Sequence, residues 1–265
     1  ACGGIWNDPY PGAEAGRNIL YSAFVERPKH LDPAQSYTED EIAITAQIYE
    51  PPLQYHYLKR PYMLVPATVE QVPVPKFYDA GGRLLPADAP AENIAESVYE
   101  LHIKPGIRYQ PHPAFAVDAA GQPQYVGTNI AEGRQSIADF PQTGTRELKA
   151  DDYIYQIKRL ASPRVQSPIR GLLHEHIAGF RELAGELAKV NAGAWLDLRD
   201  FPLAGVDVVD RYRLRIRLND VYPQFQYWLA MPFFAPLPWE ADRFHSQPGL
   251  AAKNITLDWY PVGTG

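Results

Sequence analysis

The sequence contains a single cysteine, Cys2, among 265 residues. One thiol excludes an internal disulfide framework and any metal site built from several cysteines. No stretch approaches the roughly 20 consecutive apolar residues that a membrane-spanning helix needs. Positive charge is also in deficit, because 25 Lys and Arg stand against 31 Asp and Glu. The formal net charge of -6 therefore argues against a general nucleic-acid binder, which needs clustered basic residues.

Signatures of catalysis are equally scarce. The sequence has neither a Gly-rich phosphate loop nor a Gly-x-Ser-x-Gly elbow. His174-Glu175-His176 looks like a zinc-protease motif, but that motif needs two histidines one helical turn apart, and the position four after His174 is Ala178. We therefore expect a polar helix face there, and no catalytic residue, metal site or cofactor in the chain. A hydrolase with paired carboxylates remains an alternative class.

Proline and aromatic residues are abundant. The chain holds 26 prolines and 17 tyrosines, and its aromatic content is 12%. Disorder is not expected at that aromatic content, so the composition indicates a loop-rich globular protein with many rigid turns. Tyrosine and tryptophan in such numbers also leave open a carbohydrate-binding protein, in which a row of exposed rings would stack on sugars.

Four segments carry clear helix or strand signals. Thr38 to Glu41 has the spacing of a capping box and predicts a helix that must end before Pro51. The apolar run 19–25 predicts a strand. Alternation of apolar and polar residues predicts two more strands, over 98–104 and 211–218.

The middle of the chain predicts two further helices. Charged residues at both ends favour a helix over 151–160. Ser167-Pro168 is a strong helix start, and apolar residues at helical spacing predict one long amphipathic helix that continues to Leu187. The Pro-rich stretch 51–90 should be extended segments and turns, and 114–144 an irregular surface excursion. The aromatic segment 225–239 should be core or interface.

Four arginines share one face of the strand predicted over 211–218. They could be interpreted as a phosphate track. Given the negative net charge, we favour a solvated sheet face on which each arginine pairs with a nearby carboxylate.

Several stretches in collinear order resemble the family 5 extracellular solute-binding proteins of bacterial ABC importers, the oligopeptide- and dipeptide-binding type. The resemblance is carried by the apolar run with the Leu31-Asp32-Pro33 turn and its helix, the segments 95–97 and 104–109, the helix segment 148–159 and the ending 260–265. Two features depart from the family pattern. Lys149 stands where the family usually has an N-capping Thr, and the stretches 51–90 and 114–144 are longer than usual.

The resemblance implies an α/β fold of the class II periplasmic-binding-protein type. It implies a partial first lobe with an inserted α+β subdomain, the second lobe being missing from this sequence. By that resemblance, 1–50 and 219–265 form part of lobe I, and 51–218 form the inserted subdomain.

The resemblance also implies a non-enzymatic function. The protein would capture a peptide or peptide-like small solute in an interlobe cleft outside the inner membrane and deliver it to an inner-membrane ABC permease. A carbohydrate or another small solute, such as an opine or a metal chelate, is the alternative ligand. The expected contacts are the loop residues Ser36, Tyr37, Thr38 and Glu39, and then Ile169 and Arg170. Thr38 is better explained as a helix cap, so Tyr37 is the stronger candidate, because it offers a ligand an apolar ring and a hydroxyl.

The start of the sequence suggests how the protein is held at the cell envelope. Cys2 follows a small residue and precedes Gly3 and Gly4, as at the processed end of a bacterial lipoprotein signal. We therefore expect Cys2 to be the lipid attachment site, and the protein to be periplasmic or at the cell envelope. A free surface thiol is the alternative. No nucleic-acid partner is expected, and membrane contact is expected only through this anchor.

Overall fold

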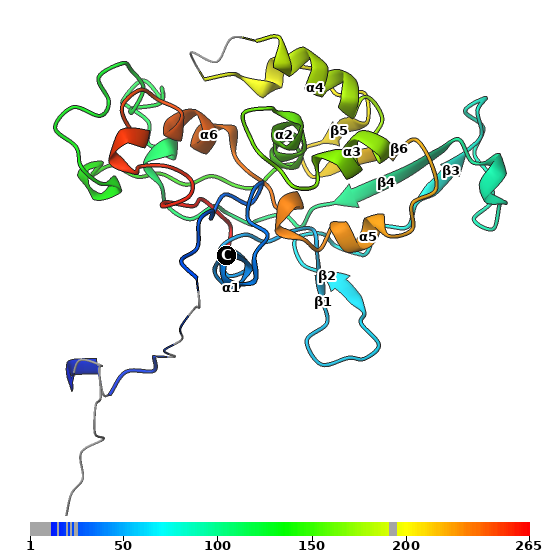
Figure 1. Ribbon diagram of the computed structural model, residues 1–265, viewed down its shortest axis with the longest axis horizontal. Helices are drawn as coiled ribbons and strands as arrows, with labels where there is room; N and C mark the ends of the chain where they lie inside the picture. Colours follow the sequence, from blue (N-terminus) through cyan, green and yellow to red (C-terminus); the bar gives the residue numbers. More distant parts are fainter. Residues whose placement is uncertain (1–11, 15, 20, 22, 24–25, 191–194) are drawn as a thin grey trace, which may run out of the picture.

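The computed structural model describes residues 12–14, 16–19, 21, 23, 26–190 and 195–265 (Figure 1). Cys2, the predicted lipid attachment site, lies outside the described residues. Of the strand predicted over 19–25, only positions 19, 21 and 23 are described, and they are not in a strand. The remaining positions of that prediction also lie outside the described residues.

A four-stranded antiparallel sheet forms the centre of the fold. Its order is β3 (Lys76–Tyr78), β4 (Glu96–His102), β6 (Arg213–Leu218) and β5 (Val206–Asp210). The strands predicted over 98–104 and 211–218 are thus confirmed as β4 and β6, with small shifts at their ends. A separate antiparallel hairpin pairs β1 (Leu53–Tyr55) with β2 (Leu64–Pro66).

The two faces of β6 differ as the alternation predicts. Its Leu214, Ile216 and Leu218 are buried. On the other face, Arg215 donates to Glu100 at 2.7 Å and Arg217 pairs with Asp207. Arg213 pairs with Asp210, and Arg211 with Glu147. The prediction of a carboxylate-paired arginine face is confirmed.

The first helix, α1 (Glu39–Thr45), begins with the predicted capping box. Thr38 accepts from the backbone N–H of Glu41, and the Glu41 carboxylate accepts from the N–H of Thr38 at 3.2 Å. The same carboxylate accepts from the backbone N–H groups of Lys29, His30 and Tyr37. One buried glutamate therefore fixes both the helix start and the loop that precedes it.

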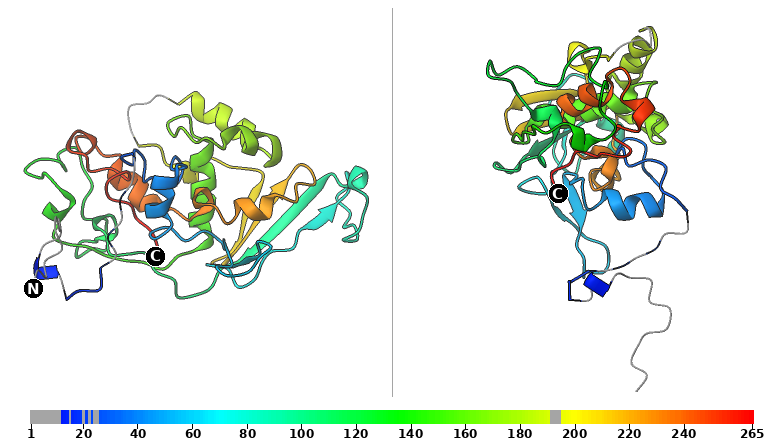
Figure 2. Two further views of the ribbon diagram at one scale, coloured as in Figure 1. Left: turned by 60° about the horizontal axis from the view of Figure 1, so that its bottom comes forward. Right: turned by 90° about the vertical axis from the view of Figure 1, so that its left-hand side faces the viewer.

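The helices that follow α1 either pack near the sheet or extend the molecule along its long axis. The helix α2 (Ala150–Ala161) confirms the prediction for 151–160 and contacts β5 and β6. The short α5 (Phe225–Trp228) and α6 (Trp239–His245) follow the sheet in sequence. Figures 1 and 2 show α6 and β3 towards opposite ends of the molecule. The described 3-10 helices are Gly12–Glu14, Ala91–Asn93, Pro113–Phe115, Ile137–Asp139, Leu198–Asp200, Pro232–Phe234 and Ala251–Lys253.

The prediction of one long helix from Ser167 to Leu187 is wrong. The chain forms two helices, α3 (Arg170–His176) and α4 (Phe180–Ala188). Between them Ile177 makes a β-bridge with Leu218, and Gly179 adopts a positive φ of 72°. Pairing with the end of β6 takes backbone groups that a continuous helix would need, and the left-handed glycine turns the chain.

A large hydrophobic core joins residues from many parts of the chain between Ala34 and Val262. It includes Tyr49, Leu101 and Leu237, and the segment 225–239 contributes Phe225 and Phe233 as predicted. The division into 1–50 with 219–265 and an inserted 51–218 stays a prediction. None of the described helices is long and apolar enough to cross a bilayer.

The irregular stretch 114–144 is not only a surface excursion. Its Tyr125 and Phe140 are buried with Phe244 of α6 in a second, smaller core cluster. The rings of Phe140 and Phe244 meet edge to face at 5.1 Å between centroids. The aromatic residues of this stretch therefore attach it to α6.

Two buried histidines lie beside this second cluster. The rings of His112 and His245 are 5.2 Å apart between centroids. Burial lowers the pKa of His112 to about 3, and the neighbouring His245 lowers it further. Burial likewise lowers the pKa of His245 to about 4. Both side chains are therefore neutral in the folded protein at pH 7.

These histidines predict a loss of stability in mild acid. The unfolded chain takes up protons near pH 6.5, whereas the folded chain does so only near pH 3 to 4. The contribution of these histidines to the free energy of unfolding is fully present above pH 6.5. It decreases as the pH is lowered further, by up to about 1.4 kcal/mol per pH unit for each histidine. We expect His112→Asn to flatten this decline in urea unfolding between pH 7 and 5, because its amide oxygen can still accept from the Ala114 N–H. Equal slopes for the two proteins would contradict the assignment.

Candidate functional site

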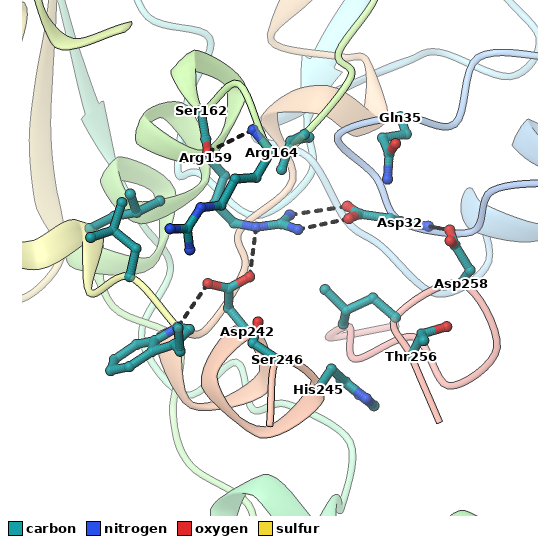
Figure 3. Close-up of a pocket in the computed structure, with 15 residues that line it drawn as sticks. Asp32, Gln35, Arg159, Ser162, Arg164, Asp242, His245, Ser246, Thr256 and Asp258 are labelled. Atoms are coloured by element: carbon teal, nitrogen blue, oxygen red, sulfur yellow. Dashed lines mark hydrogen bonds and ion pairs between the residues drawn. The ribbon is translucent and has the colours of Figure 1, made fainter. Parts of the chain in front are cut away.

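A polar pocket of about 230 Å³ lies where the loop before α1 meets the end of α2 (Figure 3). The end of α6 and the segments 195–198 and 256–258 complete its wall. Its wall combines three carboxylates, two guanidinium groups, a histidine and a tryptophan. The charged and aromatic lining includes Asp32, Arg159, Arg164, Trp195, Asp242 and Asp258.

Arg159 is the centre of this pocket's wall. Its Nη1 and Nη2 donate to the two carboxylate oxygens of Asp32 at 3.0 and 2.7 Å. Its Nε donates to Asp242 at 3.1 Å. The side chains of Arg159 and Asp32 are only 4% and 6% exposed. One buried guanidinium thus joins the turn before α1 to α6, as Figure 3 shows.

The charges of this pair support one another. Burial alone would raise the pKa of Asp32, but the charge and hydrogen bonds of Arg159 outweigh it and hold that pKa below its usual value. Burial opposes the charge on Arg159 as well, and the carboxylates of Asp32 and Asp242 more than offset it, so its pKa is raised. Both groups are therefore ionised at neutral pH, in a site where interactions between charges are screened only weakly.

Asp242 connects the ion pair to the aromatic part of the wall. Its second carboxylate oxygen accepts from the Tyr155 hydroxyl at 2.6 Å and from the Trp195 indole N–H at 3.1 Å. Trp195 lies 6.1 Å from Trp239 between ring centroids, and the Arg243 guanidinium lies 5.6 Å from the Trp195 ring centroid. The indole is thereby held in one orientation at the pocket.

Asp258 closes the wall on the opposite side of the Asp32 turn. Its Oδ1 accepts from the backbone N–H groups of Leu31 and Asp32 at 3.1 and 3.2 Å, and His30 Nδ1 lies 3.5 Å from the same oxygen. Its side chain is 29% exposed. Asp258 thus anchors a loop and still presents negative charge to solvent.

This arrangement is suited to binding. The pocket offers an aromatic ring, an arginine and a partly exposed carboxylate next to one another, which can bind a ligand with both apolar and charged groups. Within the described part of the chain, no group of three or more His, Cys, Asp or Glu could hold a metal ion.

The residues predicted from the loop before α1 lie beside the pocket. Ser36 is buried, with its hydroxyl 3.5 Å from that of Thr45, and Thr38 is the helix cap. Tyr37 is 63% exposed, and Glu39 is exposed as well. None of the four lines the pocket, although the adjacent Gln35 does.

The second predicted pair also flanks the pocket. Ile169 is buried. Arg170 donates to the carbonyls of Ser162 and Val165, and both of these residues line the pocket. The structure thus places Arg170 as a support of the wall, and the role of all six residues as ligand contacts stays a prediction.

The central residues of the pocket were not identified from the sequence as a site. Asp32 is part of a turn motif and Arg159 of a helix end, and each pattern has a local explanation. No local pattern marks Asp242. Only the position of Asp32 and Arg159 in the stretches that carry the family resemblance hints that they belong together.

A larger hollow of about 520 Å³ lies between α1 and the β1–β2 hairpin. Its wall is mainly apolar and includes Ile42, Tyr49, Tyr55 and Met231. The smaller pocket is the stronger candidate, because charged groups with shifted pKa values converge there.

Comparison with known proteins gives matches among solved structures only. No protein-family model matches the chain, and no curated protein matches it. OppA of Listeria monocytogenes, bound to peptide, matches 89% of this chain at 12% identity with a TM-score of 0.51. The murein tripeptide-binding protein MppA of Escherichia coli covers 90% at 15% identity, TM-score 0.52. DppA of Helicobacter pylori, a periplasmic binding protein in complex with a peptide, covers 89% at 17%, TM-score 0.50.

The chain has the fold of part of these binding proteins. It spans 33% of the length of each of the three, which confirms the α/β fold class expected for part of a first lobe. Each of the three is described as a binding protein or as bound to a peptide.

The ion pair at the pocket predicts a specific stability effect. Asp32→Asn leaves the buried Arg159 with one charged partner, and we expect it to lower the free energy of unfolding by about 3 kcal/mol. Glu186→Gln is the matched control, because Glu186 pairs with Lys189 on an exposed helix surface, where such pairs contribute little. Urea unfolding of both variants measures the difference. Equal stability of the two would show that the pair does not hold the wall together.

Proposed function

We propose that this protein is the extracytoplasmic substrate-binding component of an ABC importer. It captures a peptide or peptide-like solute in an interlobe cleft and delivers it to an inner-membrane permease. The observation that carries the proposal is the shared fold with several peptide-binding proteins, over about nine-tenths of this chain. The protein is then a binding protein and not an enzyme, and it works in the periplasm or at the cell envelope.

In this proposal the Arg159 pocket is one wall of the ligand site. Trp195 offers a flat apolar surface to a ligand side chain, and the Asp258 carboxylate offers a partner for a positive group. Tyr37, on the adjacent loop, adds an exposed ring and hydroxyl. A volume of about 230 Å³ is below the roughly 300–1,000 Å³ of most small-molecule sites. The pocket therefore holds one part of an extended ligand.

Closure of a cleft over the ligand would strengthen these contacts. Main-chain hydrogen bonds and charge pairs at the ends of a peptide gain strength as water leaves. A binding protein of this kind shifts from open to closed because the ligand binds the closed state more tightly.

A sugar is the second candidate ligand. Trp195 and Trp239 lie 6.1 Å apart between ring centroids, and both side chains are half-buried. The Arg199 guanidinium covers one face of Trp239 at 3.7 Å from its centroid, so Trp195 is the ring that would stack on a sugar. The importer role would be the same, and only the ligand class would differ.

The first test is native mass spectrometry of the full-length protein with both lobes, purified without refolding and then challenged with a mixed peptide library. We expect retention of peptides. Retention of sugars instead would show that the ligand is a sugar and not a peptide. Retention of nothing would contradict the proposal.

Substitution of Trp195 tests the site itself. We expect Trp195→Phe to weaken binding of a retained peptide about fivefold in calorimetry, because the ring loses area and its hydrogen bond to Asp242. Trp228→Phe is the control, since Trp228 bonds to Tyr222 outside the pocket. Equal affinity of the two variants would place the ligand elsewhere.

A further inference from the structure

The loop between β1 and β2 carries an unusual group of exposed apolar side chains. Tyr57 is 90% exposed, Leu58 77% and Tyr62 66%. Met63 at the end of the loop is also exposed. Figure 1 shows this loop projecting from the body of the molecule beyond β1 and β2. We refer to residues 56–63 as the hairpin tip.

The hairpin tip is positively charged, although the chain as a whole is negative. It contains Lys59 and Arg60 next to Leu58, and no Asp or Glu occurs between Glu50 and Glu70. The Arg60 guanidinium lies 4.5 Å from the centroid of the Tyr62 ring. Two cationic groups and four large apolar side chains therefore share one small protrusion.

The tip is held firmly on the body. The backbone N–H of Leu53 donates to the carbonyl of Leu229 at 3.0 Å. Tyr55 stacks on Tyr227 at 6.3 Å between centroids and meets Tyr62 edge to face at 5.9 Å.

The turn at the tip is ordered as well. Within it, His56 Nδ1 accepts from the N–H groups of Leu58 and Lys59 at 3.2 and 3.3 Å. The backbone thus presents the exposed side chains in a fixed arrangement, so that binding costs little conformational entropy in this loop.

We propose that the hairpin tip docks the protein on an anionic phospholipid surface. Tyr57 and Leu58 enter the headgroup region, where an amphipathic tyrosine and an aliphatic side chain are both favoured. Lys59 and Arg60 pair with lipid phosphates from above. This contact is additional to the lipid anchor expected at Cys2.

The shape and charge of the tip favour a membrane over other occupants. The apolar side chains stand at the end of a protrusion and line neither of the two pockets described above, so a partner protein would find little surface to enclose. A second copy of this chain carries a net charge of -6, but its own tip is positive, so tip-to-tip contact is repulsive. A fluid anionic surface fits both features.

The test is flotation of the unacylated protein with vesicles of equal parts phosphatidylglycerol and phosphatidylcholine. We expect binding at low salt that weakens as salt is added, and little binding to pure phosphatidylcholine. Leu58→Ser should weaken binding about tenfold through lost apolar burial. The double change Lys59→Glu and Arg60→Glu should weaken it by at least about twentyfold. A Tyr57→Trp variant should shift its emission to shorter wavelength when vesicles are added.

Two control variants lie on other surfaces. Leu84→Ser removes a leucine that is 59% exposed in another turn, and Lys76→Glu reverses an exposed charge on β3. Both should bind vesicles as the parent protein does. Equal binding by tip and control variants would overturn the proposal, as would no binding by the parent protein. Self-association that Leu58→Ser abolishes, or binding of purified permease without binding of vesicles, would also overturn it.

Discussion

The buried Arg159 guanidinium is the interaction on which the rest of the structure depends. It reaches Asp32, 127 residues away in sequence, and Asp242, 83 residues away. A charge removed from water is tolerated only when its partners satisfy it completely. The turn before α1, the end of α2 and α6 are therefore fixed in one arrangement, and the candidate ligand pocket is the space that this arrangement leaves.

A second arginine repeats the constraint at the other end of α2. Arg146 donates to Asp152 at 2.8 and 2.7 Å and to Glu240 at 2.7 Å through both Nε and Nη2. The helix α2 is thus joined to α6 near both of its ends, while its apolar side chains pack against the sheet. A rigid wall of this kind suits a binding protein, because side chains held in place lose little freedom when a ligand arrives.

The elements predictable from sequence are those whose signals are local. The capping box at Thr38 and the alternation along 213–218 depend on neighbouring residues, and both appear as expected. The prediction of one helix from 167 to 187 is wrong because a tertiary contact interrupts it. Ile177 pairs with Leu218, and Gly179 takes a left-handed conformation. Helical spacing of apolar residues continues through this break, so the pattern alone could not show it.

The candidate site was less accessible from sequence for the same reason. Asp32, Arg159 and Asp242 come together only in the folded chain, and each looks ordinary in its own segment. The family resemblance pointed to the loop after the Leu31-Asp32-Pro33 turn, which is next to the pocket, but it missed Trp195 and Asp242.

The most direct test of the central claim, that the Arg159 pocket is a wall of the ligand site, is an NMR titration of the tryptophan indole N–H signals with a peptide that the protein retains. We expect the Trp195 signal to move saturably, because its N–H bonds to Asp242 at the pocket, while the signal of Trp228 stays in place. Movement of Trp228 with Trp195 unchanged would contradict it.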